Sequence, residues 1–74
     1  MKQFDYVISE ADIQTMGQQL RALRRARGLT QKEVSEMAGI SHIYYALLET
    51  DRRTPSVRTL KKLRAVYEQP ITIK

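Results

Sequence analysis

The sequence predicts an all-α domain of four helices. Three observations lead to this fold class: apolar residues recur at steps of three and four, hydroxyl side chains stand where helices should begin, and glycine or proline stands where they should end. The chain has 74 residues, enough for one small hydrophobic core but too few for a deep catalytic cleft. A core of this size is commonly stabilised by pairing with a second copy.

The first predicted helix covers residues 10–27. Ser9 followed by Asp12 matches an N-terminal cap with a carboxylate three residues later, and Gly28 ends the helix. The apolar residues between them are spaced by three or four, so they should share one face. They are Ile13, Met16, Leu20 and Leu23.

The second predicted helix covers residues 31–38. Thr30 and Glu33 form a capping box at its start, and Gly39 permits the left-handed backbone conformation that ends it. A short amphipathic helix is therefore expected. Its apolar residues are Val34, Met37 and Ala38.

The third predicted helix covers residues 42–49 and follows almost at once. Ile40 should fill the corner, and the Ser41 hydroxyl should cap the new helix at a steep angle to the previous one. Tyr45 and Leu48 fall on its inward face, with the Tyr45 hydroxyl expected to reach a polar atom at the edge of the core. Two short helices joined in this way are the outline of a helix-turn-helix.

The fourth predicted helix covers residues 57–67. A polar loop ends at Pro55, and Ser56 caps the helix. Four apolar residues at helical spacing are predicted to face inward: Val57, Leu60, Leu63 and Val66.

Both ends of the chain have a different pattern. "KQFDYVI" and "PITIK" contain alternating or β-branched residues, so each is either a short strand or a frayed tail. Pairing, with each other or with a second subunit, is the interpretation we favour for Pro70–Lys74. The predicted organisation is an N-terminal extension at 1–12, a folded domain at 13–67, and a tail or strand at 68–74 that is a candidate dimerisation element.

The charge distribution favours a polyanionic partner. Residues 13–74 carry 12 basic and 5 acidic side chains, a net charge of +7. Charge alone is nearly as compatible with ordinary solvated helix faces, so the positions of the basic residues must decide. There is no cysteine and His42 is the one histidine, which leaves no metal-binding cluster, and we expect no cofactor. No catalytic pair, phosphate-binding glycine loop, secretory signal or membrane span is apparent, so the expectation is a non-enzymatic cytoplasmic protein.

At this point the chain resembles a known family. "MGQQLRALRRARGLTQKEVSEMAGIS", a later glutamate and "RTPSVRTLKKL" are similar to the repressor/Cro type of helix-turn-helix, the xenobiotic response element family. The resemblance covers Ile13–Val66 and implies a small lambda-repressor-like bundle. It implies that residues 31–38 cross the DNA backbone and that residues 42–49 lie in the major groove. The matching positions are Leu20, Arg24, Gly28, Leu29, Thr30, Gln31, Val34, Ala38, Gly39, Ser41, Glu49, Pro55 and Leu60.

The same resemblance implies roles for particular side chains. Gln31 corresponds to a phosphate-contacting glutamine at a positive helix end, against the alternative of a solvated helix start. Arg24 and Glu49 correspond to a structural ion pair. The other implied contacts to the DNA backbone come from Ser41, Arg52, Arg53 and Arg58.

The third helix departs from the family pattern in its outward chemistry. Its implied base-contacting positions hold His42, Ile43, Tyr44 and Leu47, where small polar or long hydrogen-bonding side chains are usual. Ile43 and Leu47 share a face and can only pack against thymine methyl groups or exclude other bases. Direct readout would then depend on His42 and Tyr44. The alternative is that Ile43 and Leu47 belong partly to the core or to a protein interface.

The implied function is sequence-specific regulation of transcription by a dimeric repressor on an inverted repeat of double-stranded DNA. Dimerisation would use the fourth helix with Tyr67, the C-terminal strand, or both. A weaker resemblance, based on size and "PITIK", is to Hip-type antitoxins, which would add a toxin protein as partner. Phage Cro-like repressors and restriction-modification controller proteins are competing members of the fold. A different class stays open: a protein-interaction module that docks through the apolar face of its third helix.

Overall fold

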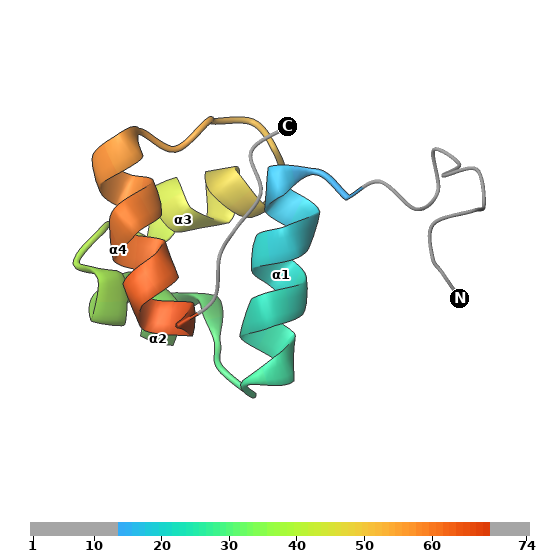
Figure 1. Cartoon of the computed structure of the whole chain (residues 1–74), viewed down its shortest axis with the longest axis vertical. Coiled ribbons are helices and arrows are strands. Elements are labelled where there is room, and N and C mark those ends of the chain that lie inside the picture. Colours follow the sequence, from blue (N-terminus) through green and yellow to red (C-terminus); the bar gives the residue numbers. More distant parts are fainter. Residues whose placement is uncertain (1–13, 69–74) are drawn as a thin grey trace, which may run out of the picture.

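Four helices make up the part of the chain that the computed structural model describes, residues 14–68, with no strand in that range. They are α1 (Met16–Ala26), α2 (Gln31–Ala38), α3 (His42–Glu49) and α4 (Val57–Tyr67). In Figure 1, α1 and α4 stand on opposite sides of α3. α3 contacts α1 and α2, and α2 contacts α4. The all-α prediction is confirmed, whereas the predicted terminal strands lie outside the described residues.

The start of α1 was predicted wrongly. Thr15 is the N-cap in extended conformation, so the helix cannot run continuously from residue 10. The Thr15 hydroxyl accepts from the Gln18 N–H at 3.1 Å, and the Gln18 side chain accepts from the Thr15 N–H at 2.9 Å. This reciprocal capping box fixes the first turn at Met16. The predicted cap at Ser9 lies outside the described residues.

The other helix boundaries are as predicted. Thr30 and Glu33 form the capping box of α2, and serine hydroxyls cap α3 and α4. Gly28 and Gly39 have φ angles of +67° and +71°, the left-handed region in which a Cβ atom is costly. The turn between α2 and α3 therefore has the geometry that the sequence predicts.

The core lies where the four helices meet. The hydroxyls of the buried Tyr45 and Tyr67 are 2.6 Å apart, so one donates a hydrogen bond to the other inside the core. Burial raises the pKa of both phenols, so they stay protonated. The buried apolar residues are Leu20, Val34, Ala38, Tyr45, Leu48, Leu60, Leu63 and Tyr67.

Two side chains predicted to face the core do not. Val57 is 70% exposed because it is the first residue of α4, and the buried stripe of that helix is centred on Leu60, Leu63 and Tyr67. Met37 is 58% exposed beside the buried Ala38. Both are apolar groups left at the surface.

Tyr67 was predicted to take part in dimerisation, and the structure places it elsewhere. It is fully buried, its ring lies 5.7 Å from the Arg27 guanidinium carbon, and Arg27 also donates to its carbonyl oxygen. These contacts join the end of α1 to the end of α4. Tyr67 therefore stabilises the fold and has no surface left for a second subunit.

The helices α1 and α3 approach closely at Gly17. A Cβ atom added there would lie 2.3 Å from the carbonyl oxygen of Glu49 and 2.7 Å from that of Leu48. Such distances are far inside van der Waals contact, and both neighbours are backbone atoms. Glycine is therefore required by packing and not by a turn.

None of the helices within residues 14–68 has the length and apolar character needed to cross a membrane.

Candidate nucleic-acid interface

The start of α3 presents its side chains outward. The Ser41 hydroxyl accepts from the Tyr44 N–H at 2.9 Å and fixes the first turn. His42 is exposed, and the Ile43 side chain is 75% exposed. Two of the four side chains predicted to contact bases are thus fully available to a partner.

The other two predicted base-contacting side chains are partly buried. Tyr44 is half-buried against the core, and its hydroxyl donates to the Thr59 hydroxyl across a 3.5 Å gap. Leu47 is also half-buried. Some of the apolar surface of α3 therefore belongs to the protein itself, which was one of the alternatives for Leu47.

The end of α3 is held by Glu49, whose side chain is buried. Arg24 Nε donates to Glu49 Oε2 at 2.7 Å, and a second guanidinium nitrogen donates to Oε1 at 3.2 Å. Gln31 Nε2 also donates to Oε1, at 2.9 Å, and Arg21 lies 3.9 Å from that oxygen. One carboxylate therefore joins α1, α2 and α3.

Electrostatics keep this carboxylate ionised. Burial by itself raises the pKa of Glu49, but hydrogen bonds from Arg24, Gln31 and Tyr45 outweigh it, so the pKa lies below its ordinary value. The same carboxylate raises the pKa of Arg24 through its hydrogen bond. Both members of the pair are charged at neutral pH, and the bidentate geometry fixes the angle between α1 and α3.

The family resemblance implied a phosphate contact for Gln31 and gave no indication of its protein partner. Its amide nitrogen donates one hydrogen to Glu49, which orients the side chain at the start of α2. The second amide hydrogen and the amide oxygen of Gln31 take no part in this hydrogen bond. At the first position of the helix, the main-chain N–H has no partner within α2.

The loop after α3 carries exposed arginines on a fixed backbone. Asp51 has a φ of +61°, a conformation that aspartate tolerates better than most residues. Its carboxylate accepts from the Thr15 hydroxyl at 2.6 Å and from the Gly17 N–H at 2.9 Å. Arg52 and Arg53 follow directly and are exposed. Sequence reasoning missed Asp51, although an acidic residue in a polar loop is a common helix cap.

The predicted site residues differ in their exposure. His42, Ile43 and Ser41 are exposed at the start of α3, and Arg52, Arg53 and Arg58 are exposed in or just after the next loop. Gln31 is half-buried, and Gln31 and Arg24 both donate hydrogen bonds to Glu49. The start of α3 and the arginines of the following segment are thus accessible to a partner, whereas Gln31 is oriented by Glu49 at the other end of α3.

Comparison with known proteins places this geometry in a family. Residues 20–73, more than half of the chain, match the HTH_3 family, described as "Helix-turn-helix". The chain belongs to the helix-turn-helix family. The resemblance to the repressor/Cro type is thereby confirmed.

Relatives of this helix-turn-helix domain include repressors. The immunity repressor protein of Bacillus phage phi105 is 45% identical over 47 residues, which are 64% of this chain and 33% of that protein. The N-terminal DNA binding domain of SinR from Bacillus subtilis has a TM-score of 0.71 and 28% identity, covering 74% of this chain and 81% of that one. The P22 c2 repressor, solved with a synthetic operator, has a TM-score of 0.73 and 25% identity, covering 76% and 85%.

The chain spans about a third or less of the length of the first curated relatives that it matches. The common part is the helix-turn-helix region. Among residues 14–68 of this helix-turn-helix domain, no group of three or more histidine, cysteine or acidic side chains could hold a metal ion.

Proposed function

We propose that this chain binds double-stranded DNA sequence-specifically and acts as a transcriptional repressor. One observation carries the proposal: α3 is fixed at both ends, by Ser41 and by Glu49, while His42 and Ile43 at its start face outward. A helix held in this way can enter the major groove without losing its orientation. Membership of the helix-turn-helix family supports the same function.

Contacts to the DNA backbone would supply most of the affinity. Arg52, Arg53 and Arg58 are exposed and can neutralise phosphates on either side of the inserted helix. Gln31 can add a neutral contact through its remaining amide hydrogen and its main-chain N–H, at the positive end of α2. Since Glu49 already binds one hydrogen of that amide, the direction of the other is fixed before DNA arrives.

Contacts to the bases would be few. The His42 imidazole can donate to or accept from a base edge, and Ile43 can pack against the methyl group of thymine. Tyr44 and Leu47, being half-buried, would touch DNA only with the part of each side chain that stays outside the core. The proposed operator therefore has thymines opposite the start of α3, and DNA shape adds to the selectivity.

The dependence of binding on salt tests the backbone contacts. Arg52→Gln and Arg53→Gln are each expected to reduce the slope of log K against log salt by about 0.9, because each removes one neutralised phosphate. The measurement is a gel shift at several salt concentrations, with Arg25→Gln on the exposed face of α1 as the matched control. Absence of a specific band, with a shallow slope, would instead support a protein-interaction module that docks through Ile43.

A methyl-deletion experiment tests the role of Ile43. Once a bound fragment has been selected from genomic DNA, replacing its thymines by deoxyuridine one at a time removes single C5-methyl groups. At the contacted position the wild-type protein is expected to lose roughly threefold to tenfold in affinity, on the order of 1 kcal/mol for one buried methyl. The Ile43→Ala variant should bind the unmodified fragment more weakly than wild type. Deoxyuridine at the contacted position should lower its affinity little further. An equal loss in both proteins at every position would rule out this contact.

A dimer on an inverted repeat is the form in which we propose that the protein acts. One domain reads few base pairs, and two copies related by a two-fold axis would place their α3 helices about 34 Å apart. Because bacterial and phage DNA lies in the cytoplasm, we expect the protein to act there.

An antitoxin role with a toxin partner stays a hypothesis based on Pro70–Lys74, which lie outside the described residues. Recovery of a kinase-like protein in a pull-down would support it.

A further inference from the structure

Asp51 has an unfavourable backbone conformation directly before two of the proposed phosphate contacts. Its φ of +61° lies in the region where a residue with a Cβ atom is less stable than glycine. The turn itself is held by main-chain hydrogen bonds: the Asp51 N–H donates to the Leu48 carbonyl oxygen at 3.2 Å, and the Arg52 N–H donates to that of Leu47 at 3.0 Å. Glycine would make the same turn without strain. The aspartate side chain should therefore do something that glycine cannot.

The Asp51 carboxylate caps α1, which is distant in the sequence. Its Oδ1 accepts from the Gly17 N–H at 2.9 Å, and its Oδ2 accepts from the Thr15 hydroxyl at 2.6 Å. Gly17 is the second residue of α1, so its N–H has no partner within the helix. The first turn of α1 contains no acidic side chain, so Asp51 also supplies the negative charge that the positive end of a helix dipole favours.

The turn after α3 is thus attached to two helices. Main-chain hydrogen bonds join it to the end of α3, and the Asp51 carboxylate joins it to the start of α1. In Figure 1, the loop that leads from α3 to α4 passes beside the start of α1. Arg52 and Arg53 follow Asp51 directly and are exposed. Ordering a flexible side chain on binding lowers affinity, and a backbone that is fixed beforehand reduces this loss.

We propose that Asp51 is a positioning residue for the contacts of Arg52 and Arg53 with the DNA backbone. By binding the start of α1, its carboxylate fixes where the two arginines begin relative to α3. Asp51 itself contacts no phosphate, because it is negatively charged and both of its carboxylate oxygens are bonded within the protein. The inference rests on the proposed function and adds to it a residue that makes no contact with DNA.

Two substitutions of Asp51 separate its hydrogen bonds from its charge. Asp51→Asn and Asp51→Gly both remove the negative charge, and both new residues tolerate the left-handed region. Asparagine keeps an oxygen that can accept from Gly17 and an amide group that can donate to Thr15, whereas glycine keeps neither. In gel shifts with operator DNA, D51G is expected to bind roughly threefold to tenfold more weakly than D51N, the effect of ordering one more flexible side chain. Equal affinities would overturn the proposal.

A double-mutant comparison distinguishes positioning from a general loss of stability. When Arg52 and Arg53 are both replaced by glutamine, the difference in affinity between D51G and D51N should disappear, since no arginine remains to be positioned. A difference that persists in this background would assign the effect of Asp51 to stability and contradict its positioning role.

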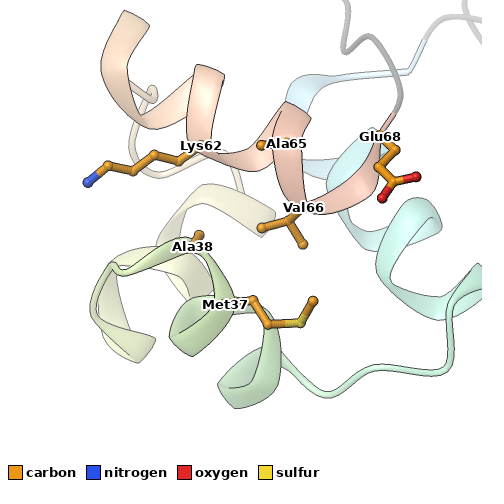
Figure 2. Close-up of a pocket in the computed structure, with 6 residues that line it drawn as sticks. All are labelled: Met37, Ala38, Lys62, Ala65, Val66 and Glu68. Atoms are coloured by element: carbon orange, nitrogen blue, oxygen red, sulfur yellow. The ribbon is translucent and has the colours of Figure 1, made fainter.

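Glu68 provides a matched control at the other end of α4. Within residues 14–68 it is the other non-glycine residue with a positive φ, at +54°. Figure 2 shows its side chain at the pocket between α2 and α4, which is lined by none of the proposed DNA contacts. Glu68→Asn and Glu68→Gly should therefore bind the operator equally. A difference as large as that between D51N and D51G would mean that the backbone alone explains both, and would overturn the proposal.

The order of the loop without DNA separates this inference from the proposed function. In NMR relaxation measurements, the main-chain amides of Arg52 and Arg53 should have lower order parameters in D51G than in D51N. If the wild-type protein gives no specific gel shift, the proposed function fails, and the order parameters still decide whether Asp51 holds the two arginines. Specific binding by the wild type, with equal order parameters or equal affinities in D51G and D51N, would refute the role of Asp51 alone.

Discussion

Gly17→Ala is expected to lower the free energy of unfolding by about 3 kcal/mol, although alanine is the better helix former. The added Cβ would lie 2.3 Å from the Glu49 carbonyl oxygen and 2.7 Å from the Leu48 carbonyl oxygen. Neither atom can rotate away, so α1 and α3 must separate, at a cost near the upper end of that for overpacked cores. For a domain of this size, the melting temperature should fall by more than about 10 °C. Thermal and urea denaturation measure both quantities.

The matched control is Ala22→Gly, at an exposed position of the same helix. Helix propensity alone makes this change cost about 1 kcal/mol and would make Gly17→Ala stabilising by a similar amount. The sign of the Gly17→Ala effect therefore separates packing from propensity. A stabilised Gly17→Ala variant would mean that α1 and α3 do not approach as closely as the structure shows. Separation of the helices would also move the end of α3 and weaken operator binding.

The bounds of α2, α3 and α4 could be predicted because their signals are local. A threonine or serine cap, a glycine in the left-handed region and a proline act within four residues of the boundary that they set. The start of α1 could not be predicted with the same certainty. Ser9 and Thr15 are both possible caps in sequence, and the choice of Thr15 is supported by Asp51, which is distant in the chain.

The candidate site could likewise be predicted only in part from the sequence. The sequence and its family resemblance bring Arg24 and Glu49 together, and the side chains are 2.7 Å apart. The resemblance did not indicate that Gln31 shares this carboxylate, nor that Tyr44 is half-buried. Both depend on how α2 and α4 pack against α3, which no spacing along a single helix reveals. Gly17 carried a weak signal, since a glycine inside an amphipathic helix usually has a packing reason.

Glu49→Ala is expected to lower the free energy of unfolding by about 3 to 5 kcal/mol. Glu49 is 2% exposed and its carboxylate accepts from both Arg24 and Gln31, so its removal leaves a guanidinium and an amide without their partner. Glu49→Gln retains the shape and one acceptor oxygen, and should cost less. Urea denaturation at neutral pH gives both values. Equal stability of wild type and Glu49→Ala would show that water replaces the carboxylate fully.

The dependence of stability on pH shows whether the charge or the shape of Glu49 matters. Its pKa in the folded protein lies below the ordinary value of 4.5, so the folded state favours the ionised form. The resulting stabilisation is fully present above the unfolded pKa and is lost as the pH falls through the folded pKa. The difference between wild type and Glu49→Gln should therefore be constant above about pH 5 and shrink at lower pH. A difference that persists unchanged into acid would assign the effect to packing. If charge is responsible, the same acid range should release Gln31 and the end of α3, so operator affinity and stability should decline together.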